Sequence, residues 1–476
     1  MDFKKYIYYT FLIAAIGTLA FSCKKDPKPE PYVVDMSGTS TLPSYAQRTG
    51  NADSGYNYLV YGGYVNSGIP YDAYVAAMGS ATPENVLGRT SFSANIPYNF
   101  NVVTAPNGIK VVSANCLNCH AAKLNGQFIL GLGNSFSDYT ADQSSNISTI
   151  DMLMNIYFPP DNQGNPSPEW VAYEPFRNAV IYTGPHIVTE KTGVNPADKL
   201  AAVLAAHRNN VDLTWSNTPS LAIPNEVIPS DTPPWWILKK KNTMFYTAVG
   251  RGDFARIMMA SSILTLQDSS QARQVDNKFN DVLSYLNSIE APAYPESINT
   301  ELANEGEALF SERCAACHGT YGINESYPNI FVEISKIGTD SLLSLSNYAY
   351  NNFTDWYNNS WFAQSPYSAF LEAGYGYVAP PLDGIWASAP YFHNASVPNL
   401  EGVLNSSVRP NYWRRNFQYP VYDFEKVGWE FTEETADIDK FTYNTQLAGY
   451  GNSGHTFGDE LSESERNSLI EYLKTL

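Results

Sequence analysis

Charged residues are scarce in this 476-residue sequence, and positive charge is the scarcer sign. Only 16% of the residues are charged, and 47 Asp and Glu against 29 Lys and Arg give a formal net charge of -18 at pH 7. Nucleic acid is recruited by clustered Lys and Arg, so this balance argues against it as a partner. A neutral or basic partner suits the chain better.

Long hydrophobic runs are also lacking, because no stretch beyond the N-terminus is apolar enough to cross a bilayer. The N-terminus combines MDFKK, a short apolar run and FS before Cys23, which is typical of a lipoprotein signal peptide. We expect residues 1–22 to be the signal, Cys23 to carry the lipid and residues 23–45 to form a Pro-rich tether. An ordinary secretory signal, in which Cys23 has no role, is the alternative.

This N-terminus also predicts the location of the protein. The chain is expected to be exported and anchored by lipid to a bacterial membrane, facing the periplasm or the cell surface. Its only contact with the membrane would be the lipid anchor.

Cysteine is too rare for a disulfide framework. Cys23 is one of five cysteines, and the other four lie in two C-x-x-C-H motifs, CLNCH at 116–120 and CAACH at 314–318. None is left over for a structural disulfide.

Both motifs have the spacing of haem c attachment sites. Two thiols match the vinyl groups on one edge of the porphyrin, and the adjacent imidazole binds the iron. A zinc knuckle needs further converging ligands, and a thioredoxin-like pair is expected at a helix start in a βαβ unit. The sequence therefore predicts two covalently attached haem c groups. Their expected residues are Cys116, Cys119 and His120 at the first site, and Cys314, Cys317 and His318 at the second.

The expected fold is mainly α, with two c-type cytochrome domains, long loops and little β-structure. A helix with Thr300 as its N-cap leads into the second motif, and a C-terminal helix opens with a capping box of Ser462 and Glu465. With 31 Gly, 30 Pro and frequent Asn-Gly or Ser-Gly steps, which suggest loops, little room is left for extended sheet, apart from a few short hairpins. The prolines of APAYPESIN mark a boundary between a first haem domain, 46–292, and a second, 293–476. Another amphipathic helix is predicted from the spacing of Val275, Phe279, Val282, Leu283 and Leu286.

Several segments resemble the bacterial di-haem cytochrome c peroxidase superfamily. YVAPPLDGIWASAPYFHNASVPNLEGVLNSSVRP looks like its C-terminal block, in which an aromatic-His segment faces the second haem. VGWEF, GNSGHTFGDELSESERNSLIEYLKTL and PPWWILKKKNTMFYTAVGRGDFARIMMASS are more similar to the di-haem rubber oxygenase branch. The resemblance runs from near residue 100 to the C-terminus. It implies one haem for electron transfer or storage, and one with an open side for peroxide or dioxygen.

The supply of sixth ligands distinguishes the two haems. No methionine follows Met259, so the second domain has no methionine for its iron. His455 is the expected ligand there, because it lies in the Gly-flanked loop GNSGHTFG and because the resemblance implies a late histidine in this role. His393, in PYFHN, is expected near this haem and its hydrogen bonds rather than on the iron.

The first haem has no obvious sixth ligand. GQFILGLGNSFSDYT, which follows the first motif, contains neither histidine nor methionine. His186 and His207 stay open as ligands, although His207 ends a predicted helix, where an imidazole commonly caps the C-terminus. This haem is expected to be five-coordinate through His120, or closed by water or dioxygen.

PPWWILKKK is the candidate link between the haems. The resemblance suggests that Trp235 or Trp236 stands between the porphyrins, with a preference for Trp236, whereas core packing is the alternative. The lysines at 239–241 either neutralise haem propionates or form a solvated face. Phe245 and Phe254 are candidates for the distal lining of the first haem.

These observations favour a di-haem oxidoreductase, in which the first haem activates peroxide or dioxygen and the second transfers or stores electrons. A non-catalytic electron-transfer cytochrome and a strict cytochrome c peroxidase are the alternatives. The acidic FWDGR-like segment of the peroxidases is missing, which favours dioxygen and an apolar organic substrate over peroxide with a small redox protein as partner. The resemblance alone implies a calcium ion between the domains, with no ligands assigned.

Overall fold

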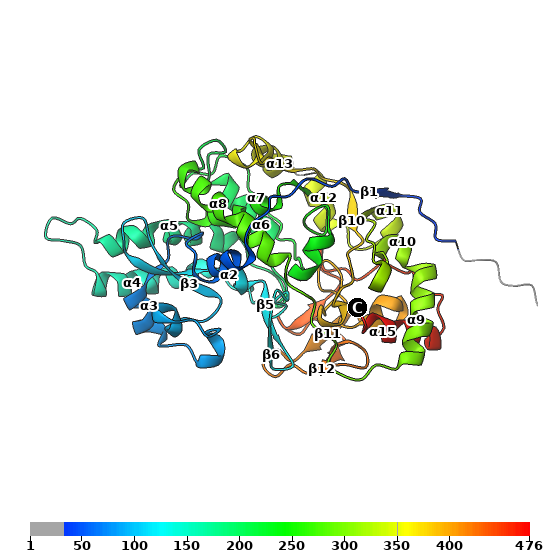
Figure 1. Ribbon diagram of the computed structural model, residues 1–476. Coiled ribbons are helices and arrows are strands. Elements are labelled where there is room, and N and C mark those ends of the chain that lie inside the picture. The colour runs from blue at the N-terminus through cyan, green and yellow to red at the C-terminus, as the bar shows by residue number, and fades with distance from the viewer. Residues whose placement is uncertain (1–32, 350) are drawn as a thin grey trace, which may run out of the picture. The chain divides into compact units, whose positions relative to one another are not determined.

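The computed structural model describes residues 33–349 and 351–476 (Figure 1). The chain divides into two units, Met1–Asp35 and Met36–Leu476, and the second is compact. The expected signal peptide and Cys23 lie outside the described residues, so the lipid anchor stays a prediction. The boundary expected near residue 292 stays a prediction as well.

Helices occur throughout the compact unit. Those before residue 293 are α2 (Ala52–Tyr61), α3 (Tyr71–Met78), α4 (Ile147–Tyr157), α5 (Pro168–Thr183), α6 (Ala197–Ala206), α7 (Phe254–Met258) and α8 (Ser269–Leu286). Those after it are α9 (Thr300–Arg313), α10 (Ala315–His318), α11 (Ile334–Ile337), α12 (Leu342–Ala349), α13 (Asn351–Asn358), α14 (Leu400–Leu404) and α15 (Glu463–Leu473).

Short strands form several small sheets. Three-stranded sheets have the orders β1-β8-β10, β2-β4-β3 and β14-β11-β15, and β5-β6, β7-β9 and β12-β13 form pairs. In the first half the strands are β1 (Thr39–Thr41), β2 (Ile69–Pro70), β3 (Phe100–Thr104), β4 (Lys110–Ala114), β5 (Ala121–Leu124), β6 (Gln127–Leu130) and β7 (Gly250–Gly252). In the second half they are β8 (Ile330–Glu333), β9 (Ala369–Leu371), β10 (Gly376–Val378), β11 (Tyr412–Arg415), β12 (Tyr422–Asp423), β13 (Gly428–Trp429), β14 (Phe431–Glu433) and β15 (Thr442–Asn444).

The expectation of a mainly α fold with little β-structure is wrong. Helix accounts for only 39% of the structure and strand for 14%. The Asn-Gly steps, which suggested loops, serve as hairpin turns. Asn125 and Gly126 join β5 to β6 directly, with φ of 49° and 76°, as a tight two-residue hairpin turn requires. The strands between such turns are only two to five residues long, too short for a clear alternating pattern.

Two of the strand pairs connect parts of the chain that lie far apart in sequence. β7 pairs with β9, and β1 pairs with β8 in an antiparallel register that sets Thr39 opposite Val332. Further along the N-terminal segment, Arg48 donates two hydrogen bonds of 2.8 Å to Asp253 and one of 2.6 Å to Asp276. Residues 39–48 therefore contact both halves of the compact unit.

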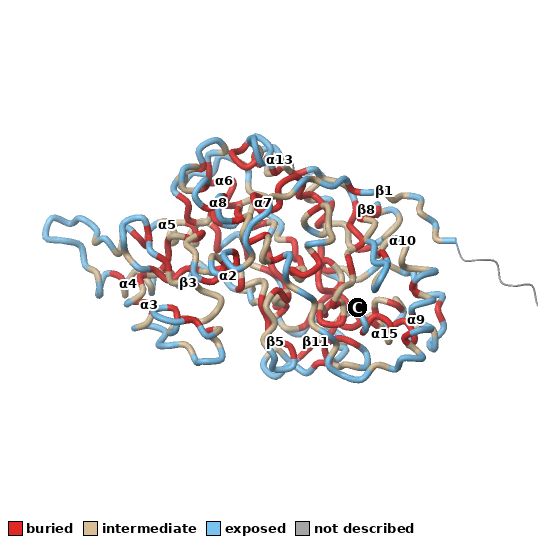
Figure 2. The backbone as a smooth tube through the Cα atoms, viewed as in Figure 1, coloured by how far each residue is buried: buried red, intermediate tan, exposed pale blue. Residues whose placement is uncertain are grey.

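Two large hydrophobic clusters form the core, and Figure 2 shows buried stretches through the interior of the compact unit. One gathers around α8, whose predicted apolar residues are all buried. The other includes α15, where the predicted capping box of Ser462 and Glu465 is confirmed. α9 begins at Thr300 and its N-cap is Asn299, which accepts from two backbone amides, so the predicted N-cap at Thr300 is wrong by one residue.

The crossing of α9 and α15 depends on Gly306. A Cβ added at this residue would lie 2.0 Å from the carbonyl oxygen of Ser468. We expect Gly306→Ala to lower the free energy of unfolding by about 1–3 kcal/mol, because the helices must separate. Thermal unfolding followed by circular dichroism measures this. Asn304→Ala, on the exposed face of α9, is the control, and equal melting temperatures for the two variants would contradict the prediction.

Candidate haem sites

The first C-x-x-C-H motif is shaped by a capped turn. Asn115 is the N-cap of the short helix Cys116–Asn118, and its side chain accepts a 2.8 Å hydrogen bond from the amide of Leu117. The amide of His120 then donates to the carbonyl of Cys116 at 3.0 Å. This turn brings both free thiols and the imidazole together.

His120 is held against an aromatic ring. It stacks on Trp235 with ring centroids 4.7 Å apart and the planes 19° apart. Burial lowers the pKa of His120 to about 4, and the nearby Pro233 carbonyl partly offsets this. The carbonyl is not a full hydrogen-bond partner, since Nδ1 is buried without one. The neutral imidazole is the form that binds a metal.

The second motif follows directly on α9. Cys314 caps that helix, and α10 carries the rest of the motif to His318. His318 Nδ1 lies 2.9 Å from the carbonyl oxygen of Pro380, to which it donates when neutral. That hydrogen bond leaves the lone pair on Nε2, the atom that would bind iron. Burial also lowers the pKa of His318.

His455 lies opposite His318. Their ring centroids are 6.3 Å apart. A metal bound between two imidazoles, with metal–nitrogen bonds of about 2 Å, would separate the centroids by roughly 6.4 Å. Nδ1 of His455 is buried without a hydrogen-bond partner, and burial lowers its pKa to about 4. The donor set and the spacing therefore fit a haem iron held by both histidines.

Close backbone packing positions the His455 loop. Gly454 has φ of 71°, and a Cβ there would lie 2.1 Å from the carbonyl carbon of Gly338. The amide of His455 donates to the carbonyl of Ile337 at 2.8 Å. Arg409 donates to the carbonyls of Gly454 at 2.6 Å and His455 at 3.1 Å. Only glycine fits so tightly, so Gly454, the last residue of the Gly-Asn-Ser-Gly run before His455, shapes this loop.

The other three histidines have different surroundings. His393 Nε2 lies 3.1 Å from the hydroxyl of Tyr377, and burial lowers the pKa of His393 to about 3. His207 ends α6, where its Nδ1 contacts the carbonyl of Ser216 at 2.8 Å. His186 is exposed. Among the described residues, no second histidine ring contacts His120 as His455 contacts His318.

The two tryptophans of PPWW belong to different clusters. Trp235 packs in the α8 cluster against His120, whereas Trp236 packs in the cluster that contains Cys314. Trp236 Nε1 donates to the carbonyl of Asp383 at 2.7 Å. The sequence preference for Trp236 overlooked the contact of Trp235 with His120. The position of Trp235, two residues after Pro233, was the sequence feature that could have indicated this contact.

Phe245 and Phe254 differ in burial. Phe254 is 3% exposed and packs in the α8 cluster, whereas Phe245 is 43% exposed. Nothing in the described structure assigns either ring to a distal pocket, so that role stays a prediction.

The basic run 239–241 is partly neutralised by protein carboxylates. Lys239 pairs with Glu290 at 2.8 Å, and Lys240 pairs with Asp383 at 2.7 Å. Lys241 instead lies 3.3 Å from the carbonyl of Phe245, and burial lowers its pKa to about 8. Lys241 is thus the member of the run that suits a propionate.

Three residues that shape the second site were not predicted from the sequence. Pro380 orients His318 and Arg409 holds the His455 loop, while Met36 Sδ lies 4.0 Å from Cys317 Sγ. Pro380 and Arg409 lie within the C-terminal block that carries the family resemblance, but no local sequence pattern indicates the role of either residue. Met36 is 281 positions from Cys317, so only the folded chain brings them together.

Comparison with known proteins identifies part of this region. The family described as RoxA-like, cytochrome c-like, matches residues 376–414, which include Pro380, His393 and Arg409. Together with the C-x-x-C-H motifs, the match indicates a cytochrome c-like domain with covalently bound haem c. It also supports a resemblance to the rubber-oxygenase-like branch at a coarse level. These findings place the protein in the class of haem cytochromes, which transfer electrons.

Two curated relatives come from Sinorhizobium fredii (strain NBRC 101917 / NGR234). The uncharacterized protein y4iJ is 29% identical over 244 residues, covering 38% of this chain and 39% of y4iJ. The uncharacterized protein y4iM is 26% identical over 310 residues, covering 56% of this chain and 69% of y4iM. The chain therefore spans less than half of the length of y4iJ.

Within residues 33–349 and 351–476, no helix is both long and apolar enough to cross a bilayer. The same residues contain no group of three or more His, Cys, Asp or Glu arranged for a metal ion. The calcium implied by resemblance therefore stays a prediction without ligands.

His455→Ala tests the second site. We expect the second haem to become high-spin with its covalent attachment intact, because the opposing imidazole is lost. Electronic absorption and electron paramagnetic resonance measure the spin state, and haem staining after denaturing electrophoresis measures attachment. His393→Ala is the control, expected to leave the second haem low-spin. An unchanged low-spin spectrum in His455→Ala would mean that another residue is the ligand.

Proposed function

We propose that the protein is an exported di-haem c-type oxidoreductase with a division of labour between its haems. The haem attached at Cys116 and Cys119 keeps an iron position for peroxide or dioxygen. The haem attached at Cys314 and Cys317 transfers or stores electrons. The supporting observation is the asymmetry of the histidines: His318 faces His455, whereas His120 faces no second imidazole among the described residues.

Coordination number explains why this asymmetry matters. Haem iron with one free position supplies a site for an oxidant, whereas two imidazoles exclude external ligands. At the first site, His120 provides a neutral imidazole and Trp235 restricts its orientation. At the second, Pro380 holds His318 in one tautomer and Arg409 holds the loop of His455.

Trp235 and Trp236 provide a short covalent link between the surroundings of the two haems. Trp235 stacks on His120, and the adjacent Trp236 reaches the carbonyl of Asp383. Asp383 is three residues after Pro380, the partner of His318. We propose that electrons cross between the sites along this segment.

The lack of an acidic segment in the sequence favours dioxygen as the oxidant over strict peroxidase activity. Splitting a peroxide bond heterolytically benefits from an acid above the iron, and the sequence lacks the FWDGR-like acidic segment. Dioxygen with an apolar organic substrate is therefore the proposed pair, and peroxide with a small redox protein is the alternative. The proposed location is a bacterial membrane surface reached through lipid on Cys23.

One observation favours a non-catalytic electron carrier instead. Met244, Met258 and Met259 belong to the same cluster as Cys116. A thioether from this group would close the first iron and leave both haems six-coordinate. The spectroscopic test below separates this candidate from the oxidoreductase.

The spin states of the oxidised protein at low temperature test this division of labour. Electron paramagnetic resonance should show one high-spin and one low-spin haem, since only the first iron lacks a second protein ligand. Cyanide or azide should convert the high-spin signal alone. Two low-spin signals that do not respond to cyanide, azide or peroxide would establish the carrier.

Turnover of dioxygen and of peroxide tests the proposed activity. Oxygen uptake with an apolar alkene should exceed peroxide consumption with a reduced small cytochrome, because no acid assists cleavage of the peroxide bond. The same assays on His120→Ala, with haem content measured, serve as the control. Faster peroxide turnover than oxygen uptake would instead support the peroxidase.

A further inference from the structure

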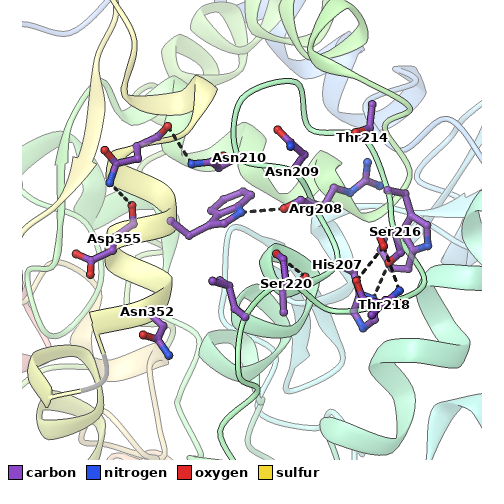
Figure 3. Close-up of a pocket in the computed structure, with 15 residues that line it drawn as sticks. His207, Arg208, Asn209, Asn210, Thr214, Ser216, Thr218, Ser220, Asn352 and Asp355 are labelled. Carbon is purple, nitrogen blue, oxygen red and sulfur yellow. Dashed lines mark hydrogen bonds between the residues drawn. The ribbon is translucent and has the colours of Figure 1, made fainter.

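A cavity of about 680 Å³ lies between the segment that follows α6 and helix α13 (Figure 3). Residues 206–221 form one wall, and residues 352–359 form the other. The volume falls within the range of about 300–1,000 Å³ that is typical of small-molecule sites. None of the haem-attachment residues lines it.

Hydrogen bonds hold the two walls together. Trp356 Nε1 donates to the carbonyl of Arg208 at 2.9 Å, and the amide of Trp361 donates to the carbonyl of Asn210 at 2.8 Å. The side chain of Asn210 also donates to the carbonyl of Asn359 at 3.3 Å. The cavity is therefore preformed, which reduces the entropy lost on binding.

The lining is rich in uncharged polar side chains. Eight of the 15 lining residues carry amides or hydroxyls, and Asp355 adds a carboxylate; the eight are Asn209, Asn210, Asn352, Asn359, Thr214, Ser216, Thr218 and Ser220. Three of these polar residues, Asn352, Asp355 and Thr218, make no side-chain hydrogen bond to described residues. Trp215, Leu221 and Trp356 add apolar surface. A purely apolar occupant would leave several of these polar groups without partners.

Charge disfavours an anion in this cavity. The guanidinium of Arg208 donates to the carbonyls of Leu213, at 2.7 Å, and Leu266, and it lies 5.2 Å from the ring centre of Trp215. Both hydrogen bonds come from Nη1, and Nε is buried without a partner, but Arg208 is only 2% exposed, so little of its charge faces the cavity. The remaining charged lining residue is Asp355, which repels anions.

We propose that the cavity binds a neutral polyhydroxylated ligand, a mono- or disaccharide. Such a ligand carries hydroxyls that both donate to and accept from amides, and C–H groups that pack on Leu221. This binding goes beyond the redox function and does not depend on it.

Calorimetric titration of the full haem-loaded protein tests the proposal. Glucose, maltose and N-acetylglucosamine are the probes, with sodium sulfate and ethanolamine as charged controls. At least one saccharide should bind, sulfate should not, and ethanolamine should bind more weakly than that saccharide. Absence of heat for all three saccharides, or binding of a charged control alone, would overturn the proposal.

Variants locate the binding. Ser220→Phe, which fills the cavity, should abolish it, and Asn352→Ala should weaken it about fivefold by removing one amide. Thr354→Ala is the matched control, since Thr354 belongs to α13 but does not line the cavity. If Ser220→Phe does not fold, Asn352→Ala decides, because its side chain has no hydrogen bond to lose. Unchanged affinity in Asn352→Ala and any folded Ser220→Phe would place the ligand elsewhere.

Discussion

The close approach of Gly454 to Gly338 sets the geometry of the second haem site. Because neither glycine has a side chain, the two backbone segments come near enough for the amide of His455 to donate to the carbonyl of Ile337. This contact places the His455 imidazole 6.3 Å from that of His318, which suits one iron between them. Any side chain at Gly454 would force the loop away and disrupt the pair.

The two haem sites resemble each other in the surroundings of the motif histidine but differ in its hydrogen bonding. Each motif histidine has a proline carbonyl beside it, Pro233 at His120 and Pro380 at His318, yet only the second forms a hydrogen bond. Trp235 supports His120 in its place through ring stacking. The proposed reactive iron would thus be oriented by an aromatic contact, and the proposed storage iron by hydrogen bonds and a second imidazole.

Local patterns predicted some elements well and others poorly. The buried face of α8 and the capping box of α15 depend on residues within one or two turns, so their spacing was sufficient. The small sheets were underestimated because their strands are two to five residues long and pair across long distances, as β1 does with β8. Such pairing depends on tertiary contacts that no short window contains.

The haem-attachment residues could be read from the chain, because thiol spacing and an adjacent imidazole are local covalent requirements. His455 could be nominated by elimination, since few histidines and no late methionine compete with it. Its distance from His318, the stacking of Trp235 on His120 and the clamp of Arg409 required the folded chain. These contacts join residues between 45 and 137 positions apart, and packing of the whole unit brings them together.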